Sequence, residues 1–168
     1  MKKQRILLLL SVLMLCISLS SLATTNADRF EAITLEGYQT SLEKSDFFDQ
    51  IIYSPTDTTK AEYILTIAYN EVYQGKTLAD LTTAEYDELV TLLSLNYNDP
   101  TVTKLKTAMG TPVIIVDESN SESDFTTITT IFQGFVLEMR IAYRDYQTVT
   151  QNDIDFGVKI FSDMNFAE

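Results

Sequence analysis

The segment 124–146 constrains the fold most, because it can be read either as two strands or as one helix. Phe125 and Phe132 belong to an apolar stripe with helical spacing of three and four residues. Against a helix, Thr126–Ile131 is an unbroken β-branched run, which loses side-chain freedom in a helix and fits a pleated sheet. Gly134 would cost a helix interior roughly 1 kcal/mol, whereas it suits a turn. We predict a β-hairpin, with a helix as the alternative.

The second strand of this hairpin has two faces of different character. Its apolar face is expected to meet the core and carries Phe135, Leu137, Met139 and Ile141. Its other face is expected to lie in solvent and carries Glu138, Arg140 and Ala142. A further strand, buried on both faces, is predicted for the β-branched apolar run Pro112–Asp117.

Helices are expected before these strands. A short one is predicted over 46–52, behind Ser45 as its N-cap, and a longer one over 57–74, ending at Gly75. The longer helix is inferred from apolar residues at helical spacing: Ala61, Ile64, Leu65, Ala68 and Val72. The residues 28–39 before them are ambiguous and are expected to be irregular or helical.

Three further helices are predicted from capping signals. Thr82 and Glu85 form a capping box, in which each side chain satisfies an amide at the start of a helix. Asp99 followed by Pro100 is typical of an N-cap and first helical position, and predicts a helix reaching Met109. Thr150, with an acid three residues later, starts the last helix.

Together these elements predict an α+β fold. Helices come first, a small antiparallel sheet of one strand and a hairpin follows, and a C-terminal helix closes the chain. If 124–146 is helical instead, the alternative is an all-α bundle.

The N-terminus has the pattern of a secretory signal peptide. A basic head is followed by an apolar run from Ile6 to about Leu19, and small residues then allow cleavage after Ala23 or Ala27. The apolar stretch is slightly short for a spanning helix, so an uncleaved anchor is the weaker alternative. We expect residues 1–23 to be removed, 24–168 to form one globular domain without a stable membrane anchor, and the protein to be periplasmic or secreted.

The missing residue types exclude several chemistries. The chain contains no histidine, and Cys16, its one cysteine, lies in the predicted leader. This excludes Ser-His-Asp and Cys-His catalysis and the usual zinc sites. Without a glycine-rich phosphate loop as well, we expect no metal and no cofactor.

The net charge of the chain limits the kinds of partner that it can bind. The formal charge of −12 becomes −15 once Lys2, Lys3 and Arg5 leave with the leader. Such a surface repels nucleic acid and anionic lipid headgroups, so we expect no nucleic-acid partner. A cationic partner would complement this surface. The alternative is that the charge serves only to keep the protein soluble.

Two acidic segments are candidates for calcium-binding loops. The first holds Asp117, Glu118, Glu122 and Asp124, and it lacks the central glycine and the terminal bidentate glutamate of a helix-loop-helix site. The second begins at Asp153, and Met164 stands where that glutamate is needed. We therefore expect no calcium site at either place.

Arg140 and Arg144 are the candidate site residues. If the hairpin forms, both lie on the polar face of its second strand, where a pair of guanidinium groups can grip a carboxylate or phosphate. The alternative is that they pair with Glu138, Asp145 or another surface acid.

These observations favour a non-catalytic role. We expect an exported binding or interaction protein of the bacterial envelope or secreted fraction, such as an inhibitor, immunity or accessory protein, with a protein or a small ligand as its partner. One alternative is a small hydrolase that uses carboxylate or Ser/Lys chemistry. Another is a small-molecule carrier.

Overall fold

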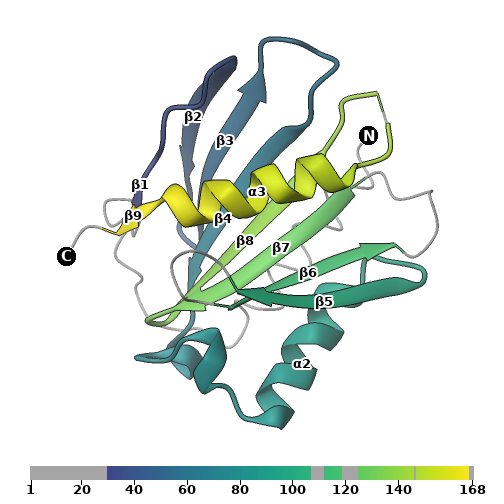
Figure 1. The fold of residues 1–168 in the computed structure, drawn as a ribbon. Helices are drawn as coiled ribbons and strands as arrows, with labels where there is room; N and C mark the ends of the chain where they lie inside the picture. The colour runs from purple at the N-terminus through teal and green to yellow at the C-terminus, as the bar shows by residue number, and fades with distance from the viewer. Residues whose placement is uncertain (1–29, 107–111, 119–124, 146, 167–168) are drawn as a thin grey trace.

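The computed structural model describes residues 30–106, 112–118, 125–145 and 147–166. Its centre is a sheet of seven antiparallel strands in the order β2-β3-β4-β8-β7-β6-β5 (Figure 1). The strands are β2 (Tyr38–Lys44), β3 (Asp49–Pro55), β4 (Glu62–Tyr69), β5 (Pro100–Lys106), β6 (Pro112–Glu118), β7 (Phe125–Phe132) and β8 (Phe135–Ala142). The expected leader, with its cleavage after Ala23 or Ala27, lies outside the described residues.

The sheet is assembled from two meanders. Strands β2, β3 and β4 follow one another in sequence and in space, and so do β5, β6, β7 and β8. The two meanders meet where β4 pairs with β8, in a register that joins Glu62 to Ala142 and Tyr69 to Phe135. This seam joins two strands that are far apart in sequence at the centre of the sheet.

Helices cover both faces of the sheet. Helix α3 (Gln151–Asp163) crosses one face, and α2 (Thr83–Ser94) lies against the other, near β5 and β6 (Figure 1). Because side chains alternate along a strand, neighbouring residues of β6 enter different cores. Ile115 packs in the core beneath α3, and Ile114 packs in the core beneath α2.

Shorter elements add to both layers. Strand β1 (Phe30–Glu31) pairs with β9 (Asn165–Phe166) in a separate antiparallel ladder. Between β4 and α2 lie two short 3-10 helices, η2 (Glu71–Tyr73) and η3 (Leu78–Asp80). They bury Tyr73 and Leu78 in the core beneath α2.

The predicted hairpin is confirmed. Strands β7 and β8 pair along their whole length, and Gln133 and Gly134 form the turn, both with positive φ. A side chain at Gly134 would put its Cβ 2.8 Å from the ring of Tyr69, so the turn needs glycine for space as well as for backbone freedom. Leu137 is fully buried with its apolar neighbours.

The strand over 112–117 and two of the capped helices are also confirmed. Thr82 and Glu85 form the expected capping box of α2, and Thr150 forms another with Asp153 at the start of α3. Both signals depend on residues three apart in sequence, so the surrounding fold does not alter them.

The expected order of helices first, then a small sheet, is wrong. The described chain is mostly β, with a seven-stranded antiparallel sheet and two α-helices, and it is not an all-α bundle. The ambiguous residues 28–39, where described, hold β1 and the start of β2. The segment expected to be a helix over 46–52 is a turn followed by β3, and Ser45 closes that turn by accepting a hydrogen bond from the Phe48 amide.

The predicted helix over 57–74 is wrong because β4 is buried on both faces. Tyr63, Leu65 and Ile67 enter the α3 core, while Thr66 and Ala68 are buried on the opposite face. An apolar run that is continuous satisfies a helical spacing and a strand spacing equally well.

The predicted helix from Asp99 is also wrong. Pro100 begins β5 instead, a position where a strand tolerates the missing amide hydrogen. The alternating and partly β-branched sequence that follows favours a strand over a helix. Met109, where that helix was expected to end, lies outside the described residues.

The prediction that one face of β8 lies in solvent is wrong. Val136 and Glu138 are buried and Arg140 and Ala142 are half-buried, because this face lies within the α2 side of the sheet. A hairpin at a sheet edge would expose that face, whereas a hairpin at the centre buries both.

Candidate functional site

The structure gives Arg140 and Arg144 different surroundings. Arg140 lies in β8 with its guanidinium carbon 4.4 Å from the centre of the Phe125 ring. Arg144 follows β8, is exposed, and places a nitrogen 3.5 Å from a carboxylate oxygen of Glu62. Arg144 thus pairs with a surface acid, as the alternative interpretation expected. Such exposed pairs contribute little to stability.

A row of polar side chains crosses the centre of the sheet on its α2 face. The strand register places Glu138 between Thr66 of β4 and Thr129 of β7. Gln50 of β3 extends the row by donating a hydrogen bond of 3.0 Å to the Thr66 hydroxyl. The next position along β8 on this face is Arg140.

Glu138 is the acidic residue of this row, and its pKa is perturbed by burial. It is 7% exposed. Burial raises the pKa of its carboxyl to about 7, and the charge of Arg140 offsets part of that rise. The buried hydroxyl of Thr129 and Nε of Arg140, on either side of Glu138, have no hydrogen-bond partner among the described residues. Buried polar groups are normally satisfied, so this cluster is unusual.

Tyr97 closes the row on the side of β7. Its hydroxyl lies 3.1 Å from that of Thr127, and its ring centre is 4.9 Å from that of Phe125. Burial is the main cause of the raised pKa of Tyr97, and Glu138 adds to it. The row therefore holds one carboxyl, one guanidinium and several hydroxyls, without the second carboxylate that glycoside hydrolysis needs.

A second polar cluster lies at the start of α3, around Asp153. Tyr143 donates its hydroxyl hydrogen to this carboxylate, at 3.0 and 3.1 Å from its two oxygens, and the backbone amide of Thr150 donates at 2.8 Å. Burial and this acceptor raise the pKa of Tyr143 to about 12. The carboxylate is thus engaged in capping the helix and in holding the strand end against it.

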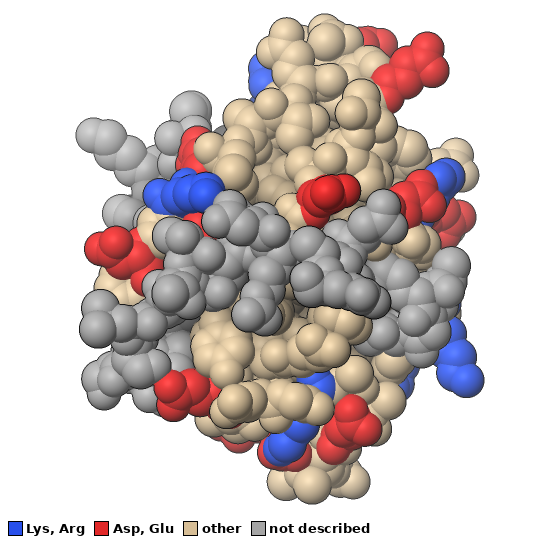
Figure 2. Space-filling view, turned by 90° about the vertical axis from the view of Figure 1, so that its left-hand side faces the viewer, with Lys and Arg blue, Asp and Glu red and all other residues tan. Residues whose placement is uncertain are grey.

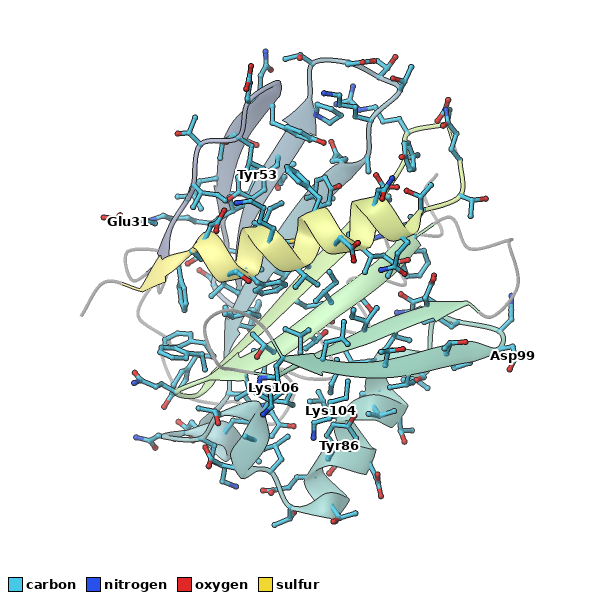
Figure 3. All side chains as sticks on the ribbon, in the orientation of Figure 1. Glu31, Tyr53, Tyr86, Asp99, Lys104 and Lys106 are labelled. Carbon is cyan, nitrogen blue, oxygen red and sulfur yellow. The ribbon has the colours of Figure 1, made fainter. Side chains whose placement is uncertain are left out.

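The two edge strands are the most exposed ordered parts of the sheet. In β5 every residue from Thr101 to Lys106 is exposed, including the apolar side chains of Val102 (37%) and Leu105 (41%). Lys104 places its ammonium 4.5 Å from the ring centre of Tyr86, which belongs to α2. Figure 3 shows Lys104 and Lys106 together on the α2 side of β5.

The opposite edge, β2, differs in charge. Its residues after Tyr38 are exposed, as in β5, but it carries Glu43 next to Lys44. In Figure 2, which faces this side of the molecule, acidic and basic side chains are interspersed. Leu42 and Phe47 are exposed apolar residues of this edge and its turn.

Sequence reasoning missed both the polar row and the β5 edge. The sequence predicts Glu138 in solvent and a helix from Asp99 to Met109, and both predictions are wrong. The available signal was the β-branched sequence of 101–103, which favours a strand but shows nothing about its place in the sheet.

The described residues hold no group of three or more His, Cys, Asp or Glu side chains that could bind a metal. Of the acidic segment weighed as a calcium loop, Glu122 and Asp124 lie outside the part the structure describes. Within that part, no helix combines the length and apolar character needed to cross a membrane.

Comparison with known proteins supplies no relative. No family model matches the chain, and neither a curated protein nor a solved structure matches it.

Proposed function

We propose that this chain is an exported, non-catalytic binding protein that engages another protein along the edge strand β5. The observation that carries the proposal is the exposure of β5, a seven-residue strand at the end of the sheet with every residue after Pro100 exposed. Its outward backbone groups have no strand beside them in the described sheet.

An edge of this kind suits strand addition. An extended segment of a partner pairs its backbone with the edge, and side chains on alternating positions then determine which segment fits. Val102 and Leu105 supply exposed apolar surface, on opposite faces of the strand. Long, exposed edges are otherwise avoided because they promote aggregation.

Four of the described carboxylates are engaged in structural hydrogen bonds. Glu85 and Asp153 cap helices, Asp117 accepts a hydrogen bond from Thr126, and Glu62 receives one from Ser54. An acid engaged in this way is poorly placed to exchange protons with a substrate. The hydrolase alternative would need two acids facing one cleft, and these four belong to separate surroundings.

The polar row favours a second candidate, a carrier of small polar molecules. Glu138, Thr129 and Arg140 offer a carboxyl, a hydroxyl and an Nε hydrogen that a bound molecule could satisfy. Native mass spectrometry of protein taken from its own host would test this. A stoichiometric small molecule, retained by wild type and lost from Glu138→Ala, would support the carrier.

Photo-crosslinking in the host tests the β5 proposal. A photoreactive residue would replace Thr103 in β5, Thr40 in β2, or Ala79 in the exposed 3-10 turn. We expect one discrete higher-mass product from position 103 and none from positions 40 and 79. Equal crosslinking at all three positions, or none at position 103, would contradict binding along β5.

A further inference from the structure

We infer that the segment β5 accepts is extended and acidic, with two carboxylate side chains two residues apart and an apolar residue between them. This inference rests on the proposed function and adds the chemistry of the partner. It follows from the arrangement of Lys104, Leu105 and Lys106 on the exposed edge.

The register fixes the direction of the two lysines. Lys104 lies opposite Ile114 and Lys106 opposite Pro112, so both side chains project on the α2 face of the sheet. Leu105 lies opposite Val113 and projects on the α3 face. Residues two apart in a strand are roughly 7 Å apart, and the same spacing in a paired segment places two carboxylates beside the two ammonium groups.

Neither lysine is neutralised within the described chain. The described ion pairs use Lys76, Arg144 and Lys159, and they leave Lys104 and Lys106 without an acidic partner. Lys104 instead rests against the ring of Tyr86, which limits the positions of its ammonium group without removing its charge. In Figure 3, Asp99 lies at the far end of β5 from the two lysines.

The net charge of the chain does not prevent this recognition. At physiological ionic strength the Debye length is about 8 Å, so acids elsewhere on the surface are largely screened. A partner carboxylate in contact with Lys104 or Lys106 would feel mainly those groups. Selectivity among acidic partners would then come from the β5 edge itself.

The edge strand β2 is a poor alternative for the same segment. Its only basic residue, Lys44, follows Glu43 directly, so the strand offers no pair of like charges on one face. An acidic segment should therefore discriminate between the two edges, which makes β2 an internal control.

Peptide titration of the isotope-labelled, cell-processed chain tests the inference by NMR. The probe is the blocked peptide Thr-Glu-Val-Glu-Thr-Val-Thr, which in antiparallel pairing sets its glutamates opposite Lys106 and Lys104. A control peptide, Thr-Glu-Glu-Val-Thr-Val-Thr, has the same composition but points the glutamates to opposite faces. We expect saturable shifts of β5 and β6 amides with the probe, and about tenfold weaker binding of the control.

Charge reversal on the protein supplies the matched comparison. The double variant Lys104→Glu/Lys106→Glu should weaken probe binding by about tenfold or more, and raised salt should weaken wild-type binding. Lys60→Glu/Lys159→Glu changes the net charge equally at exposed sites outside β5 and should bind as wild type does. Circular dichroism of each variant checks that it is folded.

The outcomes separate this inference from the proposed function. If position 103 crosslinks but both peptides bind with equal affinity, the proposed binding along β5 stands and the inference of an acidic segment is refuted. Shifts centred on β2 would overturn the choice of edge. A wild-type dimer that the Lys104→Glu/Lys106→Glu variant converts to monomer would show that β5 pairs with a second copy, and would overturn the acidic segment.

Discussion

Replacing Glu138 by Gln should stabilise the protein, and by an amount that depends on pH. Burial raises the pKa of this carboxyl from its ordinary 4.5 to about 7. Of the groups around it, Thr66 and Thr129 are uncharged, and the charge of Arg140 offsets only part of the burial. The ionised carboxylate is therefore poorly tolerated in the fold.

The sign of this stability difference follows from whether the folded or the unfolded chain holds the Glu138 proton at a given pH. Below about pH 4.5 the carboxyl is neutral in both the folded and the unfolded chain, so wild type and Glu138→Gln should differ little. Between pH 4.5 and 7 the unfolded chain releases this proton while the folded chain keeps it, and wild type loses stability as pH rises. Above pH 7 the loss is complete and amounts to roughly 3 kcal/mol, since each pKa unit corresponds to about 1.4 kcal/mol.

Urea unfolding at several pH values measures this difference. The free energy of unfolding of Glu138→Gln should exceed that of wild type by roughly 3 kcal/mol near pH 8, and the two should converge near pH 4.5. Glu43→Gln, at an exposed position of β2, is the control and should show no such divergence. The reasoning is refuted if the difference between Glu138→Gln and wild type is constant across this range.

The remaining predictions concern the core, one cap, the N-terminus and metals. Leu137→Asp should cost at least about 2–5 kcal/mol, the range for losing a buried Leu side chain alone, and should cost more than Ala142→Glu at the half-buried end of β8; urea unfolding of both variants would reveal a reversed order. Hydrogen bonds from Lys76 and Thr82 lower the pKa of Glu85 to about 2, so the stability advantage of wild type over Glu85→Gln should vanish as pH falls from 4.5 towards 2; an unchanged advantage would contradict it. N-terminal sequencing of exported protein should begin at Thr24 or Asp28, and an intact leader would contradict cleavage. Metal analysis after dialysis should find no stoichiometric zinc or copper, and one zinc per chain would overturn this.

Elements specified by local chemistry could be predicted from the sequence. The capping boxes at Thr82 and Thr150 need only residues three apart, and the hairpin turn needs only Gly134 between two β-branched or alternating runs. In each case the residues that determine the structure are neighbours in sequence.

Elements whose character depends on their place in the sheet could not be predicted. Strand β4 is buried on both faces, with Tyr63, Leu65 and Ile67 in the core beneath α3 and Thr66 and Ala68 buried on the opposite face. Its sequence then fits a helix as well as a strand. For β5 the Asp99-Pro100 pair imitates a helix start, and only the pairing with β6 decides otherwise.

The candidate site was predictable only in part. Arg140 and Arg144 were predicted as two cations on one face of a strand, but that criterion shows nothing about burial. The perturbed carboxyl of Glu138 depends on its central position between β4 and β7, which the sequence specifies only through the complete sheet.

The seam between β4 and β8 has a consequence for how the protein is made. Each meander can form from local contacts, but β4 reaches its partner only after the chain has been synthesised through β8. Pairings between distant segments form slowly, and until then both meanders expose an apolar strand edge. At high concentration, the β4 edge of one chain can join the β8 edge of another in the native register. The expected by-product of overexpression is therefore a domain-swapped dimer with native-like secondary structure, whose yield rises with protein concentration during refolding.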